Sequence, residues 1–319
     1  MADRVEITVL VDNYVDIFLS STAHAKYPTP GKASRVWGEQ GLSLWVEVWD
    51  RGKVLRILYD FGRSAQVLLH NARLLDIDIT TADFVVLSHA HADHYGGLSR
   101  VLKMTADSCR FVVHRGACGI KRFVKHEGSV VGPWGITKRL LKTFQPRVIM
   151  SDGLTALGYD TYVSGEIERQ TDFEKGMPNA FLKERGALVH DRIADDQALF
   201  IELDPNRIVV VTGCAHAGVV NTLLHAQGLF PARTMYALVG GFHLNNADER
   251  QMGETVRYLR SLDVEYIAGL HCTGYHAQKA MMDQFKERWI PGTVGTRITL
   301  ASKFQTMSID QNSKPDSQG

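Results

Sequence analysis

Three features are scarce in this sequence: cysteine, long apolar runs and net charge. Four cysteines among 319 residues are too few for the disulfide framework of a small secreted protein. No apolar run approaches the roughly 20 residues that cross a bilayer, and the N-terminus lacks the basic-then-apolar pattern of a secretory signal. The formal net charge of +1 favours neither a nucleic-acid partner nor an acidic disordered tail. We therefore expect a cytoplasmic protein that acts without a membrane or nucleic-acid partner.

Hydrophobic periodicity predicts an α/β protein in which short strands alternate with helices. The expected strands cover residues 5–11, 42–48, 54–59, 84–87, 198–203, 208–211, 235–239 and 264–268. The expected helices cover residues 64–75, 97–104, 219–227 and 248–262. The apolar run at 84–87 is continuous, which is typical of a strand that is buried on both faces.

Composition divides the chain into a regular part and two less regular parts. Residues 1–301 are expected to form one domain. The segment from about 116 to 194 is rich in Gly, Lys and Arg, and we expect it to be an insertion that carries a lid or a substrate-binding wall. The polar residues 302–319 are expected to form a disordered tail.

The chemistry is concentrated directly after the expected strand at 84–87. Three histidines and a carboxylate lie within six residues there: His89, His91, Asp93 and His94. Residues two apart in an extended segment point the same way, so His89 and His91 can bind one ion, and the other two can reach a second ion after the chain turns. These donors suit Zn²⁺, Mn²⁺ or Fe²⁺. A His-rich surface turn is the alternative, but α/β sheets place ligands at this end of their strands.

The same residues carry a resemblance to a known family. The pattern HxHxDH at residues 89–94 resembles the signature of the metallo-β-lactamase superfamily, and Asp60 in LYDFG resembles its upstream aspartate motif. The resemblance implies a four-layer αβ/βα sandwich. It also implies that two downstream histidines, each just past an expected strand, complete a site for two divalent ions, Zn²⁺ or alternatively Mn²⁺ or Fe²⁺. The implied metal ligands are His89, His91, Asp93, His94, His216 and His271.

Further motifs extend the resemblance from about residue 5 to 300. SGEIER, DDQAL, TGCAHAGVVNTL, GGFHL and HCTGYHA are similar to the subfamily of 7,8-dihydropterin-6-yl-methyl-4-(β-D-ribofuranosyl)aminobenzene-5′-phosphate synthases. Two positions depart from the pattern. Glu168 stands where the subfamily has proline, and Cys214 stands where most superfamily members have a bridging aspartate. We expect Cys214 to pack beside the metal ligands, although its thiolate could also bind zinc.

Five more residues are expected to support the site or to bind substrate. His243, in GGFHL, could bind a substrate phosphate or act as an acid; the alternative is a hydrogen-bonded loop histidine. Arg169 could bind a phosphate, because a guanidinium matches it in a bidentate manner. Asn13 follows the first expected strand and is expected to contact the substrate or to cap a turn. Asp60 is expected to support the ligand histidines from behind or to be a bridging ligand, and Asp196, or alternatively its neighbour Asp195, is expected to orient a ligand histidine.

The resemblance implies an enzyme with Asp93 and His243 as candidate catalytic groups. Two divalent ions would acidify bound water and polarise a substrate oxygen. The helix that begins near Gly96-Gly97 offers N–H donors for an anion, so we predict an anionic, phosphate-bearing small-molecule substrate. Two reactions are open: hydrolysis, and a synthase-like reaction in which an aminobenzene attacks a pterin methylene and pyrophosphate departs. The alternatives are a non-catalytic metal-bound nucleotide or pterin sensor and a metal-dependent nuclease, and the near-zero net charge argues against the nuclease.

Overall fold

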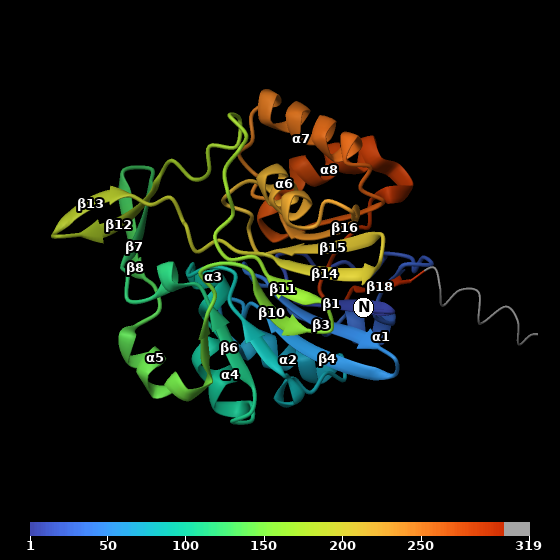
Figure 1. Ribbon diagram of the computed structural model, residues 1–319, viewed down its shortest axis with the longest axis horizontal. Helices are drawn as coiled ribbons and strands as arrows, with labels where there is room; N and C mark the ends of the chain where they lie inside the picture. The colour runs from blue at the N-terminus through green and yellow to red at the C-terminus, as the bar shows by residue number, and fades with distance from the viewer. Residues whose placement is uncertain (303–319) are drawn as a thin grey trace, which may run out of the picture.

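The computed structural model describes residues 1–302, and two large β-sheets lie face to face at its centre (Figure 1). The first main sheet has the strand order β2-β18-β1-β3-β4-β5-β6-β9 and the second has the order β10-β11-β14-β15-β16-β17. Helices α2 and α4 lie on the outer side of the first sheet, and α6, α7 and α8 lie on the outer side of the second (Figure 1). The four layers predicted from the sequence are therefore present. The predicted tail at 302–319 lies outside the described residues, except for Ser302.

The strands of the two main sheets are short, and β14 and β15 are buried along their whole length. The first main sheet contains β1 (Arg4–Val11), β2 (Ala25–Lys26), β3 (Ser43–Asp50), β4 (Lys53–Tyr59), β5 (Phe84–Val86), β6 (Arg110–Val113), β9 (Val148–Met150) and β18 (Arg297–Ala301). The second contains β10 (Thr155–Gly158), β11 (Thr161–Val163), β14 (Leu199–Asp204), β15 (Arg207–Thr212), β16 (Thr234–Gly241) and β17 (Tyr266–Leu270).

The helices connect and cover these strands. They are α1 (Pro30–Ala33), α2 (Ala65–Leu74), α3 (Ala92–Tyr95), α4 (Leu98–Met104), α5 (Lys138–Thr143), α6 (Val219–Leu229), α7 (Glu249–Ser261) and α8 (Tyr275–Phe285). Among residues 1–302, none of them has both the length and the apolar character that a bilayer span requires.

The alternating strand faces divide the apolar side chains between separate cores. Along β1, Ile7 points into the core between the two sheets, which it shares with Val209 of β15, whereas Leu10 points to the core under α2 and α4. Both faces of these strands are buried, which explains why they are nearly continuous apolar runs in the sequence. Each fully buried Val, Leu or Ile side chain contributes about 1.5–3 kcal/mol, so the sheets form a rigid base for the loops at their edge.

The parallel strands of both sheets end at one shared edge. In the first sheet β4, β5, β6 and β9 are parallel neighbours, and in the second β15, β16 and β17 are parallel neighbours. Every candidate metal ligand follows the end of one of these strands: His89 after β5, His216 after β15 and His271 after β17. The carboxyl ends of parallel strands are where α/β sheets place ligands. The topology therefore gathers distant residues at this edge.

A third, small sheet projects from the same edge (Figure 1). It has the strand order β13-β12-β7-β8 and consists of two hairpins, β7 (Arg122–His126) with β8 (Ser129–Trp134) and β12 (Ala180–Glu184) with β13 (Ala187–His190). The segment 116–194, expected to be an insertion, is thus divided between sheets. Its middle strands belong to the main sheets, because β9 pairs with β6 and β11 pairs with β14.

Candidate metal centre

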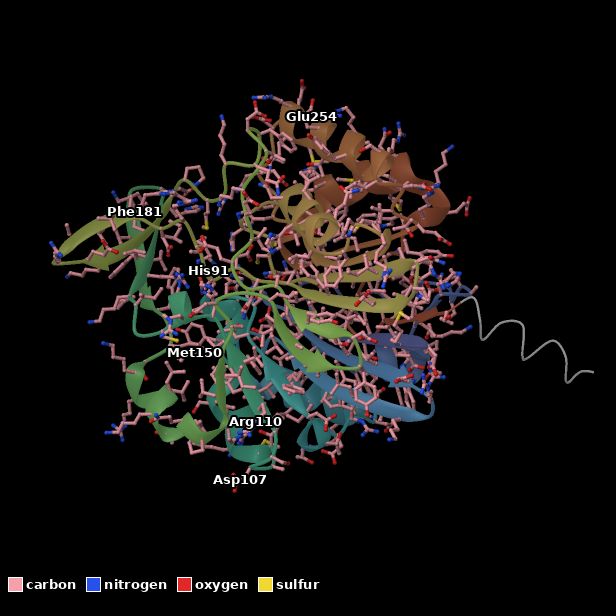
Figure 2. All side chains as sticks on the ribbon, in the orientation of Figure 1. His91, Asp107, Arg110, Met150, Phe181 and Glu254 are labelled. Carbon is pink, nitrogen blue, oxygen red and sulfur yellow. The ribbon has the colours of Figure 1, made fainter. Side chains whose placement is uncertain are left out.

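The loop after β5 brings two histidines onto one side of the chain, as their spacing predicted. His91 is the N-cap of α3 with φ of −88° and ψ of 149°. The Nε2 atom of His89 lies 3.0 Å from Nδ1 of His91 and 3.1 Å from Nε2 of His216. All three side chains are buried. Three ring nitrogens thus converge at the edge of the sheets, where His91 lies between the small sheet and the main sheets (Figure 2).

Burial keeps this group of histidines neutral. Loss of solvation, together with neighbouring positive groups, lowers the pKa of His91 to about 3 and lowers the pKa values of His89 and His216 well below the ordinary value. Neutral imidazole is the form that binds a metal ion. The Nδ1 atom of His216 is also buried without a hydrogen-bond partner among the described residues. The donor set therefore fits a divalent cation.

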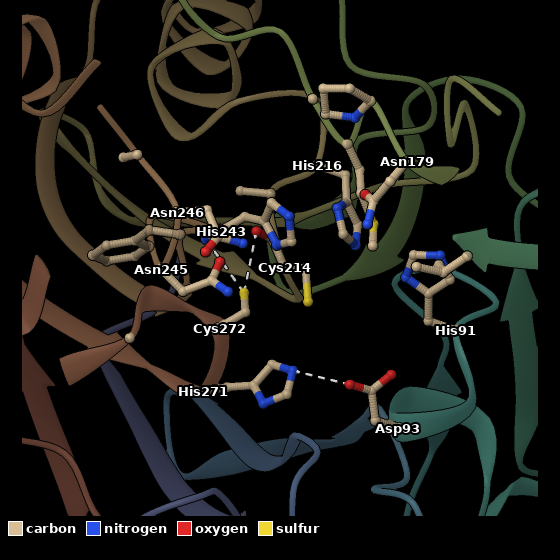
Figure 3. A pocket seen from close by; sticks show the side chains of 18 of the residues that line it. His91, Asp93, Asn179, Cys214, His216, His243, Asn245, Asn246, His271 and Cys272 are labelled. Carbon is tan, nitrogen blue, oxygen red and sulfur yellow. Dashed lines mark hydrogen bonds and ion pairs between the residues drawn. The ribbon is translucent and has the colours of Figure 1, made fainter. Parts of the chain in front are cut away.

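A second group lies beside the first. The Nε2 atom of His271 is 3.4 Å from Oδ2 of Asp93, as Figure 3 shows, and the Cys214 sulfur is 3.1 Å from Nε2 of His94. The ligand atoms of His94, Cys214 and His271 all lie within 4.8 Å of one another. Burial raises the pKa of Asp93, but the hydrogen bond from His271 and the nearby histidines lower it by more. The net pKa is below the ordinary value, so the carboxylate stays ionised.

Carboxylates behind the histidines fix their ring orientations. Asp60 accepts hydrogen bonds from the backbone N–H and hydroxyl of Ser88 at 2.7 Å each, and its Oδ2 lies 2.6 Å from Nδ1 of His94. Burial lowers the pKa of His94, but Asp60 raises it by more, to about 9. The Nδ1 atom of His94 is thus bound to Asp60 and its Nε2 is directed toward Cys214. The supporting position predicted for Asp60 is the position seen.

Asp12 and Asn13 hold His271 in place, Asp12 through the histidine backbone and Asn13 through the ring. Asp12 accepts the backbone N–H of His271 at 2.7 Å, and Oδ1 of Asn13 lies 3.0 Å from its Nδ1. Asn13 was expected to contact substrate; it lines the cavity described below and also contacts this histidine. Its side chain therefore leaves the Nε2 of His271 directed toward Asp93.

A buried ion pair reaches from the small sheet to the histidine loop. Asp195 accepts the backbone N–H of Ala90, between His89 and His91, at 2.8 Å, and both of its oxygens bind the guanidinium of Arg122 on β7. Arg122 also donates to Asp191 at 2.6 Å. Its side chain is 2% exposed and that of Asp195 is 0% exposed. Sequence reasoning missed Arg122, because a single arginine within a short strand carries no motif.

The neighbouring Asp196 supports the other ligand loop. Its Oδ2 accepts the backbone N–H of Ala217, directly after His216, at 2.9 Å. Burial raises the pKa of this carboxyl to about 7. Consecutive aspartates before β14 thus contact the loops that follow β5 and β15, and Asp196, which was expected to orient a ligand histidine, contacts the backbone next to His216.

The backbone of the site contains several residues in the left-handed region. Asp60, Ala215, His243 and His271 have φ values of 61°, 53°, 47° and 47°. Residues other than glycine adopt this conformation at a cost of about 1–3 kcal/mol and do so mainly at functional sites. The hydrogen bonds from Asp12 and Asn13 to His271 offset this cost at one of the four positions.

Comparison with known proteins agrees with this geometry. Residues 38–107 match the family model of the metallo-β-lactamase superfamily. A 7,8-dihydropterin-6-methyl-4-(β-D-ribofuranosyl)-aminobenzene-5′-phosphate synthase of Methanocaldococcus jannaschii is 31% identical over 281 residues, which cover 87% of this chain and 93% of that protein. The chain belongs to the metallo-β-lactamase superfamily. The family and the fold predicted from the sequence are thereby confirmed.

Two further relatives of this superfamily chain extend over similar lengths. An uncharacterised protein of Methanocaldococcus jannaschii is 27% identical over 265 residues, covering 82% of this chain and 91% of that protein. A crystal structure described as a metal-dependent hydrolase of the β-lactamase superfamily superimposes with a TM-score of 0.71 at 23% identity, covering 93% of this chain and all of that one. The second likeness shows the shared fold.

A cavity of about 980 Å³ opens onto the superfamily's histidine site. Its floor includes His91, Asp93, His216, His243 and His271. Its walls come from the small sheet, from the segment before β12 and from the loop before α7; they include Val124, His126, Val131, Trp134, Lys175, Met177, Asn179, Asn245, Asn246 and Arg250. The ring of Trp134 meets that of His91 edge-on at 6.3 Å between centroids. The wall residues carry no motif in the sequence.

His243 and Cys272 form a third cluster at the side of the cavity. The backbone N–H of His243 donates to the Cys272 sulfur at 3.3 Å, and the rings of His243 and His216 lie 4.4 Å apart. Burial lowers the pKa of His243, but the neighbouring Cys272 raises it by more. Its Nδ1 is buried without a hydrogen-bond partner among residues 1–302. The structure therefore brings His243 to the cavity, as expected.

Arg169 does not reach the cavity. One of its guanidinium nitrogens donates to the carbonyl of Arg192 at 2.7 Å and another to that of Ala217 at 3.4 Å. It lies behind the loop that carries His216 and is not among the residues that line the cavity. Backbone carbonyls thus take up the donors that were expected to bind a phosphate.

Proposed function

We propose that this protein is a dinuclear metal-dependent enzyme that acts on an anionic, phosphate-bearing small molecule. The observation that carries the proposal is the pair of buried donor groups that face one large cavity. In this assignment His89, His91 and His216 hold the first ion, and Asp93, His94 and His271 hold the second. The two divalent ions, Zn²⁺ or alternatively Mn²⁺ or Fe²⁺, would supply Lewis acidity and lower the pKa of bound water.

The residues behind the ligands suit this role. A metal-binding histidine usually donates its other ring N–H to a carboxylate or carbonyl, which fixes the ring and raises its basicity. Asp60 does this for His94, and Asn13 offers its side-chain oxygen to His271. Asp195 and Asp196 hold the loops that carry the first group through backbone N–H groups.

The cavity supports an anionic substrate with a flat ring system. Arg63 and Lys175 line it without a carboxylate at salt-bridge distance among residues 1–302, so their charges are free to meet a phosphate. Trp134 offers an aromatic surface, and Asn245 and Asn246 offer amide groups for the polar edge of a heterocycle. A volume of about 980 Å³ lies at the upper end of the range for small-molecule sites.

Asp93 and His243 are the proposed catalytic groups. Asp93 stays ionised, so it serves as an anionic ligand and as a hydrogen-bond acceptor that orients a bound group, rather than as an acid. The neighbouring Cys272 raises the pKa of His243 above its ordinary value, which favours the protonated ring, and His243 lies at the cavity wall with one ring nitrogen that has no hydrogen-bond partner among residues 1–302. It would donate that proton to a phosphate oxygen or to a leaving group.

The reaction is proposed to be either a hydrolysis or the transfer of a pterin-methyl group from its pyrophosphate to an aminobenzene acceptor, with pyrophosphate as the leaving group. The relative named as a dihydropterin-related aminobenzene phosphate synthase supports the transfer. The metal-loaded protein would be incubated with a dihydropterin pyrophosphate and a ribofuranosyl-aminobenzene phosphate, and separately with a phosphodiester and a lactone. We expect turnover of at least one, with loss of activity in His91→Ala. Tight binding of a pterin or nucleotide without turnover under Zn²⁺, Mn²⁺ or Fe²⁺ would instead indicate a sensor.

The small sheet is proposed to form the substrate wall. Val124 and His126 of β7 and Val131 and Trp134 of β8 all face the cavity. Arg122 ties this sheet to Asp195 and hence to the histidine loop. We infer that residues 1–301 act as one domain in which this wall and the metal site are held together.

A further inference from the structure

Cys214 occupies the centre of the candidate metal site. Its side chain is 3% exposed, and Figure 3 shows its sulfur pointing into the space bounded by His91, His216 and the Asp93–His271 pair. It is the second residue after β15, which ends at Thr212. The sequence analysis expected it to pack beside the ligands, with ligation as the alternative.

A close approach of two backbones sets this central position. A Cβ atom added at Gly213 would lie 2.1 Å from the hydroxyl oxygen of Ser88 and 3.1 Å from Oδ2 of Asp60. Glycine therefore lets the end of β15 lie directly against the loop that carries His89. On the other side, the backbone N–H of Gly241 donates to the carbonyl of Gly213 at 3.0 Å. The residue that follows, Cys214, is thereby directed between the two donor groups.

The Cys214 sulfur is close to donors of both groups. It lies within 4.8 Å of the ligand nitrogens of His89 and His216, and within the same distance of those of His94 and His271. Its separation from Nε2 of His94 is 3.1 Å. Paired metal ions in enzymes lie about 3.5–4 Å apart, so one sulfur at this place can contact both.

We propose that the Cys214 thiolate is a ligand shared by both metal ions, an inference that rests on the proposed dinuclear function. Thiolate is a good ligand for zinc. The thiol proton is released to solvent when the metal–sulfur bond forms. A soft donor shared by both ions also shifts the preference of the site from Mn²⁺ toward Zn²⁺.

Cys272 provides a matched control. Its sulfur is also next to the site, but it belongs only to the cluster with Cys214 and His243 and to neither donor group. It accepts the backbone N–H of His243 and donates to the carbonyl of Cys214 at 3.6 Å. Replacement of either cysteine by serine removes one thiol from the same region.

The test uses the full-length protein loaded with Co²⁺. We expect a near-ultraviolet thiolate-to-cobalt charge-transfer band in the wild type, its loss in Cys214→Ser and its retention in Cys272→Ser. Cys214→Asp should keep the bound metal while losing the band. A band that persists in Cys214→Ser, or its absence from wild-type protein that holds two ions, overturns the inference. A wild type and Cys272→Ser that both bind no metal would instead refute the dinuclear function itself.

X-ray absorption at the zinc edge tests the same inference on the zinc-loaded wild type alone, so it does not depend on whether a variant folds. A shared thiolate predicts a sulfur shell near ~2.3 Å with about one sulfur per zinc, whereas a thiolate on one ion gives about half. A shell containing only nitrogen and oxygen at ~2.0–2.2 Å would contradict ligation by Cys214. A value of one half would contradict the sharing.

Discussion

Replacement of Arg122 by alanine should weaken both the fold and the first metal position. The change leaves two carboxylates, Asp191 and Asp195, at 3% and 0% exposure without their cation. Loss of one partner of a buried ion pair costs about 3–5 kcal/mol, and we expect a loss of this size in the free energy of unfolding. Urea denaturation of the metal-free protein at neutral pH measures it.

The effect of Arg122→Ala on metal affinity distinguishes the Arg122–Asp191–Asp195 network from a buried ion pair that only stabilises the fold. Asp195 holds the N–H of Ala90 between two proposed ligands, and loss of such a supporting partner lowers metal affinity by about 10–100-fold. Arg207 pairs with Asp204 at 7% and 5% exposure, at the opposite end of β15 from His216. Arg207→Ala should therefore destabilise the fold without changing metal affinity.

Either of two results would refute the proposed coupling of Arg122 to the histidine loop. A change in unfolding free energy below about 1 kcal/mol, the size typical of a solvent-exposed ion pair, would show that the buried network is not a coupled unit. An equal loss of metal affinity in the Arg122→Ala and Arg207→Ala variants would show that the affinity follows global stability. Arg122→Lys, which keeps the charge but loses the planar fork, should fall between wild type and alanine.

Three further predictions concern pH and the cavity. The folded pKa values of His89, His91 and His216 are lowered, so the unfolded chain binds more protons than the folded one. The unfolding free energy of the metal-free protein should therefore fall as pH drops from about 6.5 toward 3. His91→Ala should make that dependence on pH less steep. The raised pKa of His94 acts in the opposite sense, so its contribution should be present below about 6.5 and disappear as pH rises through about 9. Trp134→Ala should raise KM about 2- to 12-fold at unchanged metal content, because an aromatic contact contributes about 0.5–1.5 kcal/mol. An unchanged KM would remove Trp134 from the substrate wall.

The metal-site cluster was predictable from sequence because its residues follow strands with strong signals. The apolar run before His89 and the strands before His216 and His271 are recognisable, and parallel strands bring their ends together. The same logic placed Asp60 and Asp196 behind the histidines. The structure adds the distances, which show that residues from β5, β15 and β17 share one centre.

The segment 116–194 was less predictable for two physical reasons. Strands β9 and β11 have three residues each, too few for a periodic signal, and their partners lie far away in the sequence. The second reason is that the charge of an arginine does not show which groups its side chain will contact in the folded protein. Arg122 is buried against aspartates, whereas Arg169 is held by backbone carbonyls, yet both occur in similar polar surroundings in the sequence.

The central claim, that two separate donor groups each bind an ion, is tested most directly by metal analysis of the wild type and three variants. After loading with Zn²⁺ and removal of excess metal, the wild type should hold two ions per chain. His91→Ala and His271→Ala should each lose metal, and His126→Ala, which alters the cavity wall alone, should keep both ions. A metal content near wild type in both His91→Ala and His271→Ala would contradict the account.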